Sequence, residues 1–187
     1  MPTMGERRRN RRFVQSFWRE SMPRILPRAL MHSARKDDGG VQNGARLGKV
    51  ATSVSWVTYR RAFYRANVRG EKIEIRVGKR TPALDGVLAR EGKRRWAFLT
   101  ACNPGARLLG PAENRARTRA LKSALRNAGY LFFAGKSGSD AGDWPEEDSF
   151  LVVGIGQRDA DRLRRRFRQD AIVTGTRGGV ARLWPQV

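Results

Sequence analysis

From about Ser53 onward, hydrophobic and polar residues follow the periods of regular secondary structure. The segment 72–77 alternates Ile or Val with Lys, Glu and Arg, the period of two that is typical of a half-exposed strand. The segments 96–101 and 150–155 are apolar on both faces, which indicates interior strands. Interior strands are often neighbours in a sheet, so we treat these two as a candidate pair.

Helix signals separate these strands. Thr81-Pro82 begins one helix, with Thr81 as the N-cap, and Pro111 begins another that Gly129 ends. The remaining expected elements are helices at 56–61 and about 157–168, and strands at 63–68, 130–134, 171–175 and 180–184. The resulting order, α-β-β-α-β-α-β-β-α-β-β, predicts a single α/β (α+β) domain. Its sheet is mixed and mostly antiparallel, with three or four covering helices.

Residues 1–52 lack any sustained period. They hold clusters of Arg among scattered Pro, Gly, Asn and Asp, a composition that favours disorder. All four Met residues lie in this segment. This also fits an over-called start, a translation start assigned too far upstream, with the natural start at a non-Met codon near Val50 or Val54. A basic arm for nucleic acid and an organelle presequence are the functional alternatives. We therefore predict a leader or over-called start at 1–52 and one domain at 53–187.

The chain is strongly basic. Its 187 residues include 39 Lys and Arg against 17 Asp and Glu, a formal net charge of +22. Such a charge favours binding to polyanions, so nucleic acid is the first partner to consider. Arg-rich composition is also common in proteins from high-GC genomes, and this interpretation stays open.

Single Cys and His residues exclude several kinds of site. With Cys102 and His32 alone, the chain can form neither an intramolecular disulfide nor a Cys/His zinc site. The domain contains no His, so it cannot hold a Ser-His-Asp triad. No apolar run approaches the roughly 20 residues of a membrane-spanning helix, and the first thirty residues lack a signal-peptide core. We expect a cytoplasmic protein with no membrane partner.

Acidic and amide residues next to the two interior strands form a candidate catalytic site. Asn103 follows the first strand, and Trp144-Pro145-Glu146-Glu147 precedes the second. If the strands are antiparallel, Asn103 lies near Glu146 or Glu147, with Trp144 over the pocket and Asn114 at the adjoining helix start. Carboxylates and amides can position a metal ion, a water or an anion. The structural alternative is that the amides are turn residues and the acids pair with Arg.

A basic helix face is the second candidate site. Arg115, Arg119, Lys122 and Arg126 recur at helical spacing opposite the apolar face, and the only acidic residue close by is Glu113. This stripe is either a polyanion-binding surface or an ordinary solvated face.

Two apparent nucleotide motifs fail. Gly154-Ile155-Gly156 would need a third glycine at Asp159, and Gly135-Lys136-Ser137 would need an earlier glycine at Tyr130 to complete a P-loop. We predict ordinary turns at both places.

Four segments resemble a known family. These are Trp96-Ala97-Phe98-Leu99-Thr100-Ala101-Cys102-Asn103-Pro104, Glu113-Asn114, Trp144-Pro145-Glu146-Glu147 before Ser149-Phe150-Leu151-Val152, and Phe167-Arg168-Gln169-Asp170-Ala171-Ile172-Val173. They resemble the bacterial family called domain of unknown function 3293, over residues 60–187, with Arg168 where the family usually has Gly. The resemblance implies a domain boundary and a fold but no activity.

Two functions remain. The first is a basic accessory protein that contacts nucleic acid or another polyanion through the stripe. The alternative is a small enzyme, such as a metal-assisted hydrolase, built from Asn103, Asn114, Glu146 and Glu147 with Trp144 in the pocket. The sequence names no cofactor, no metal ligand set and no oligomeric state.

Overall fold

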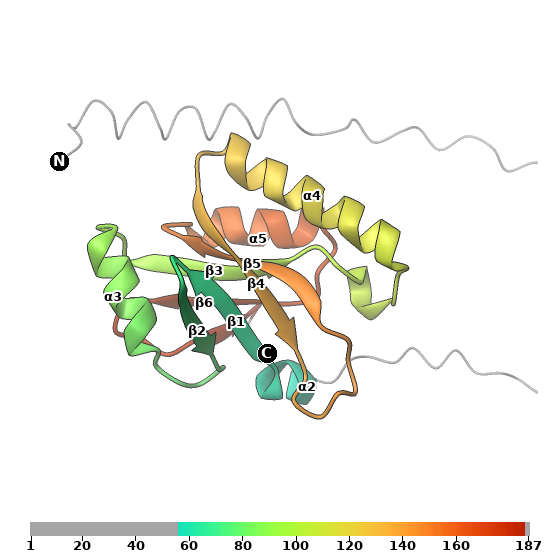
Figure 1. Cartoon of the computed structure of the whole chain (residues 1–187), viewed down its shortest axis with the longest axis horizontal. Coiled ribbons are helices and arrows are strands. Elements are labelled where there is room, and N and C mark those ends of the chain that lie inside the picture. Colours follow the sequence, from blue (N-terminus) through green and yellow to red (C-terminus); the bar gives the residue numbers. More distant parts are fainter. Residues whose placement is uncertain (1–55, 186–187) are drawn as a thin grey trace, which may run out of the picture. The chain divides into compact units, whose positions relative to one another are not determined.

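A computed structural model describes residues 56–185 of the chain (Figure 1). The prediction for residues 1–52 lies outside this range. The helices are α2 (Trp56–Arg61), α3 (Pro82–Arg90), α4 (Pro111–Asn127) and α5 (Gln157–Arg166). The strands are β1 (Phe63–Val68), β2 (Glu71–Ile75), β3 (Arg95–Thr100), β4 (Leu131–Gly138), β5 (Glu147–Val153), β6 (Ile172–Thr176) and β7 (Arg182–Trp184). The predicted element order and the α+β class are confirmed.

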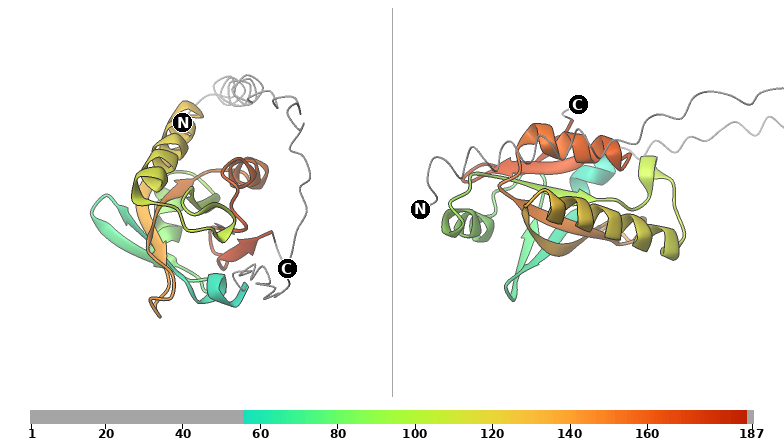
Figure 2. Two further views of the ribbon diagram at one scale, coloured as in Figure 1. Left: turned by 90° about the vertical axis from the view of Figure 1, so that its right-hand side faces the viewer. Right: turned by 90° about the horizontal axis from the view of Figure 1, so that it is seen from above.

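The strands form one curled, antiparallel sheet in the order β2-β1-β4-β5-β3-β6-β7. Every ladder between neighbouring strands is antiparallel. An isolated parallel bridge joins Val77, which follows β2, to Ala181, which precedes β7. Two backbone hydrogen bonds reinforce it, from Gly78 N to Ala181 O at 2.8 Å and from Ala181 N to Lys79 O at 3.0 Å. The two outer strands therefore approach each other, and Figure 2 shows the resulting curl.

The two faces of the sheet are covered differently. On the outer face, α4 and α5 bury Leu121, Leu125 and Leu163. On the inner face, the apolar cluster combines Phe98 of β3 and Leu151 of β5 with residues of both outer strands and of α3. Because strand side chains alternate between faces, every second residue of β3 and β5 points into the curl. This alternation decides which polar residues reach the interior.

Several element boundaries differ from those predicted. Strand β4 runs to Gly138, so the turn predicted at Gly135-Lys136-Ser137 is wrong, and this segment pairs with β1 and β5. Strand β5 begins at Glu147, three residues earlier than predicted. Thr81 precedes α3, but its side chain makes no capping hydrogen bond. Helix α4 ends before Gly129, which has a φ of +70° as a helix-terminating glycine requires.

No helix among residues 56–185 is both long enough and apolar enough to cross a membrane. Cys102 is buried and free.

Candidate functional site

The antiparallel pairing of β3 with β5 creates the candidate site. Thr100 at the end of β3 lies opposite Ser149, near the beginning of β5. The chain that leaves β3 and the chain that enters β5 therefore share one edge of the sheet. The strand pairing expected from the two apolar segments is present.

Asn103 is the central residue of this edge. It has a φ of +46°, a left-handed conformation that Asn tolerates better than most residues. Its side-chain Oδ1 accepts hydrogen bonds from Leu109 N at 2.9 Å and from Asn114 Nδ2 at 3.0 Å. Because the backbone N–H of Leu109 can only donate, Oδ1 must face it, and Nδ2 must face Glu147. Asn114 Oδ1 in turn accepts the backbone N–H of Asn103 at 3.0 Å.

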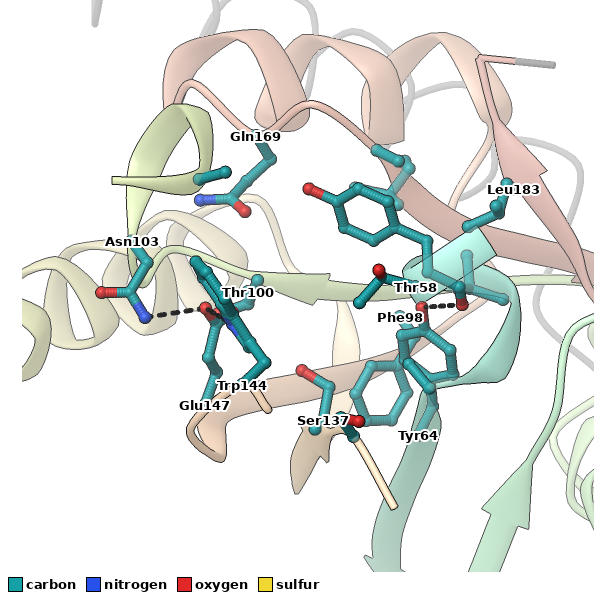
Figure 3. A pocket seen from close by; sticks show the side chains of 18 residues that line it. Thr58, Tyr64, Phe98, Thr100, Asn103, Ser137, Trp144, Glu147, Gln169 and Leu183 are labelled. Atoms are coloured by element: carbon teal, nitrogen blue, oxygen red, sulfur yellow. Dashed lines mark hydrogen bonds between the residues drawn. The ribbon is translucent and has the colours of Figure 1, made fainter. Parts of the chain in front are cut away.

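Glu147 is a buried carboxylate held by neutral groups. Its side chain accepts hydrogen bonds at Oε1 from Asn103 Nδ2 at 2.8 Å and from Trp144 Nε1 at 2.9 Å (Figure 3). The residue is only 8% exposed, and no Lys or Arg in the described part of the chain forms an ion pair with it. Burial raises the pKa of Glu147, while the hydrogen bonds from Asn103 and Trp144 oppose this rise.

The structure separates the two glutamates that the sequence could not distinguish. Glu147 contacts Asn103 directly, whereas Glu146 is exposed and makes no hydrogen bond or ion pair with a described residue. Asn114 positions Asn103 rather than facing the carboxylate. Trp144 adjoins the pocket as predicted and also donates to Glu147. The expected alternative role of the acids, pairing with Arg, does not apply to Glu147.

A pocket inside the curl contains these groups. It encloses about 70 Å³, more than the roughly 10–15 Å³ that one water needs. Tyr64, Phe98 and Leu183 form apolar walls. Figure 3 shows them around the same space as the polar side chains of Asn103, Glu147 and Gln169. The pocket thus combines apolar walls with few polar groups, as small-molecule sites usually do.

Sequence reasoning missed several residues of this pocket. Ser137 lies opposite Glu147 in the β4–β5 ladder, in the segment that was interpreted as a turn. Gln169 is 9% exposed, and its Nε2 donates to Cys102 O at 2.7 Å. Tyr59 of α2 also lines the pocket, and burial together with the charges of Asp170 and Glu147 raises its pKa to about 12. The family resemblance included Gln169, the one available signal for this residue.

Cys102 has a structural role. Its Sγ lies 3.5 Å from Thr118 Oγ1, and burial raises the pKa of the thiol above its ordinary value. A raised pKa disfavours the thiolate that a nucleophile needs. Nearby, Arg117 of α4 donates to Ala101 O and to Phe167 O, both at 2.6 Å. Cys102 and Arg117 therefore help to hold the Asn103 loop in place.

The α4 basic stripe (Arg115, Arg119, Lys122 and Arg126) lies on the exposed side of its helix. None of its four side chains forms an ion pair with a residue of the 56–185 range. The stripe belongs to the outer face of the sheet, whereas the pocket lies inside the curl.

Within the described residues, no group of three or more His, Cys, Asp or Glu side chains could hold a metal ion. The metal-assisted form of the enzyme hypothesis therefore has no cluster of acidic, His or Cys ligands in this part of the chain.

Comparison with known proteins gave one match. Residues 99–172 match the family model described as Protein of unknown function (DUF3293). Searches of curated proteins and of solved structures gave no match. The matched segment contains Asn103, Asn114, Trp144, Glu147 and Gln169.

Proposed function

Residues 99–172 match the model of a family of proteins of unknown function, and we propose that the pocket inside the curl binds a small organic molecule and that Glu147 exchanges a proton with it. One observation carries the proposal: a buried carboxylate lines a pocket and has no cationic partner among residues 56–185. Burying an ionised group in this way costs free energy, and such groups are concentrated at functional sites.

The surroundings of Glu147 suit acid–base chemistry. A raised pKa brings a carboxyl group closer to neutral pH, where it can both accept and release a proton. Asn103 and Trp144 fix the carboxylate in one orientation. A carboxylate has about four acceptor sites, so its neutral donors leave room for a ligand. The proposed chemistry needs no metal ion.

Replacing Glu147 by glutamine should give a protein at least as stable as the wild type at pH 8. The folded protein binds the Glu147 proton more tightly than the unfolded chain does, because burial raises the pKa. Wild-type stability relative to the variant should therefore fall as pH rises from about 4.5 through the raised pKa, and stay level above it. Thermal unfolding of both proteins between pH 4 and 8 measures this difference.

The control is Glu146→Gln, the same substitution at the exposed neighbour, which should follow the wild-type pH profile. The titratable groups that sense the charge of Glu147 are Tyr59, Tyr64 and Cys102. Burial raises the pKa of each above its ordinary value, which already lies above 8. In the folded protein these groups therefore stay protonated over the pH range of the experiment. A large loss of stability in Glu147→Gln at pH 8 would make the carboxylate a structural group and contradict the proposal.

Ligand binding is tested by screening small organic molecules against the full chain by ligand-observed NMR. We expect the compounds that bind to lose at least tenfold in affinity in Glu147→Gln and to retain it in Glu146→Gln. If the affinity of the compounds that bind fell equally in both variants, or fell in neither, Glu147 would not have the proposed role.

The α4 basic stripe supports a second candidate function, contact with nucleic acid or another polyanion. Its cations are exposed, and none is neutralised by an ion pair in the described part of the chain. Changing all four to Glu should weaken binding to DNA or RNA and reduce the slope of log affinity against log salt by up to about 4. Fluorescence anisotropy at several salt concentrations measures both quantities.

The matched control for the stripe changes four exposed cations elsewhere in the domain to Glu: Lys72, Lys79, Arg90 and Arg177. It alters net charge by the same amount and should reduce binding less. Equal losses in both variants would show that overall charge, not the stripe, binds the polymer.

A further inference from the structure

We infer that the ligand of the pocket carries a positively charged nitrogen, an ammonium or a guanidinium group, attached to an apolar body. The inference rests on the proposed function and adds the chemical class of the ligand. It follows from pocket oxygens that are left to accept hydrogen bonds and from the negative charge of Glu147.

Gln169 presents an acceptor. Its Nε2 donates to Cys102 O at 2.7 Å, and a carbonyl oxygen requires a donor, so the amide orientation is fixed. Its Oε1 accepts no hydrogen bond from a described residue. Figure 3 shows the Gln169 side chain reaching into the space that Trp144 and Thr58 surround. A buried carbonyl oxygen without a donor is costly, and a ligand that donates to it would remove that cost.

Ser137 also presents an acceptor. Ser149 Oγ donates its single hydrogen to Glu147 O at 3.1 Å, so Ser149 can only accept from Ser137, whose Oγ lies 2.9 Å away. The hydrogen of Ser137 is then used within the protein, and its lone pairs remain. Tyr64 likewise keeps its lone pairs as acceptors, because its hydroxyl hydrogen is donated to Tyr59 O at 3.0 Å.

The charge of Glu147 adds to these acceptors. Glu147 is bound by neutral donors only, so its negative charge is uncompensated. A group with several donors and a positive charge meets both requirements at once. Trp144 also lines the pocket, and aromatic rings attract cations. Tyr64, Phe98 and Leu183 provide the surface for an apolar body.

An anionic ligand is disfavoured for the same reasons. It would bring a second negative charge to Glu147 and leave the Gln169 and Ser137 oxygens without donors. The formal net charge of +22 attracts anions and repels cations in general. Saturable binding of a cation would therefore come from the pocket and not from the overall field of the protein.

The test uses four small probes with similar unbranched alkyl groups: n-butylammonium, n-butylguanidinium, n-butanol and butyrate. Each is titrated into the full ¹⁵N-labelled chain at pH 8, and the Trp144 indole N–H resonance is followed, assigned by its loss in Trp144→Phe. We expect saturable shifts with both cations, at dissociation constants at least tenfold lower than for n-butanol, and no saturation with butyrate.

Two variants and pH provide the controls. Glu147→Gln should weaken the binding of both cations at least tenfold, while Glu146→Gln should change it less than twofold. Lowering the pH through the pKa of Glu147 should weaken binding, because the neutral acid lacks the charge that attracts the cation.

The outcomes separate the two proposals. Tighter binding of n-butanol or butyrate than of the cations would overturn the ligand class and leave a pocket that binds through Glu147. The ligand class would also be overturned if none of the four probes bound while a different compound from the screen bound through Glu147. Failure of the probes together with an empty screen would overturn both proposals.

Discussion

An Asn103→Asp variant should lose about 3 to 5 kcal/mol of unfolding free energy at pH 8 and recover most of it near pH 4. The substitution preserves shape and keeps Oδ1 as an acceptor for Leu109 N and Asn114 Nδ2. However, it replaces the Nδ2 donor, 2.8 Å from Glu147 Oε1, by a carboxylate oxygen. Two buried carboxylates at this distance cannot both ionise, so one proton must be shared between them.

The pH dependence follows from that shared proton. The folded variant binds it more tightly than the unfolded chain, so stability relative to the wild type falls as pH rises through the raised pKa of the pair. Chemical denaturation at pH 4 and pH 8 measures the two free energies. Asn67→Asp is the control, because Asn67 is exposed and its Oδ1 accepts the Gly70 N–H at 2.8 Å. It should change stability by no more than about 0.5 kcal/mol. An equal loss for Asn103→Asp at both pH values would refute the proposed carboxylate repulsion.

Replacing Gly135 by alanine should destabilise the domain by about 3 kcal/mol. A Cβ at this position would overlap the backbone O of Arg65 in the neighbouring strand and approach Phe98 Cζ to 2.8 Å. The backbone oxygen cannot move without disturbing the β1–β4 ladder, in which Gly135 pairs with Ala66. Since Phe98 lines the pocket, ligand binding should weaken together with stability.

The control for this prediction is the same substitution at Gly86. This residue lies within α3, and a Cβ there would contact nothing within 4 Å. Alanine in a helix is favoured over glycine by roughly 0.5–1 kcal/mol, so Gly86→Ala should stabilise the domain slightly. Thermal or chemical unfolding of both variants measures the opposite signs. A neutral effect of Gly135→Ala would mean that β1 and β4 are farther apart than the structure shows.

Much of the fold and part of the candidate site could be predicted from local pattern. The continuous apolar segments 96–101 and 150–155 indicated two interior strands, and the structure places them side by side and antiparallel. From that arrangement alone, Asn103 and the Trp144–Glu147 segment were expected at one edge of the sheet. In the structure, both Asn103 and Trp144 donate hydrogen bonds to Glu147. The roles of these residues in binding or catalysis remain predictions.

The rest of the site depended on strand length, which local pattern did not resolve. The segment 135–138 contains two glycines and polar residues, so its composition is typical of a turn. It is nevertheless a strand, because β1 and β5 supply hydrogen-bond partners on both sides. Ser137 thereby enters the pocket, and Glu147 becomes the first residue of β5. The β1 partners are distant in the sequence, so no short window around this segment contains them.

The sequence by itself determined the order of helices and strands, the two interior strands, the exposed basic stripe and the exclusion of an intramolecular disulfide. These properties depend on residues close together in the chain or on composition. Only the tertiary structure decided that Glu147 rather than Glu146 enters the interior, because a shift of one residue in a strand exchanges its two faces. The contact between Val77 and Ala181 likewise closes the sheet into a curl, and Gln169 and Ser137 line the same pocket. Long-range pairing and register, which local periodicity does not encode, place these side chains around one space.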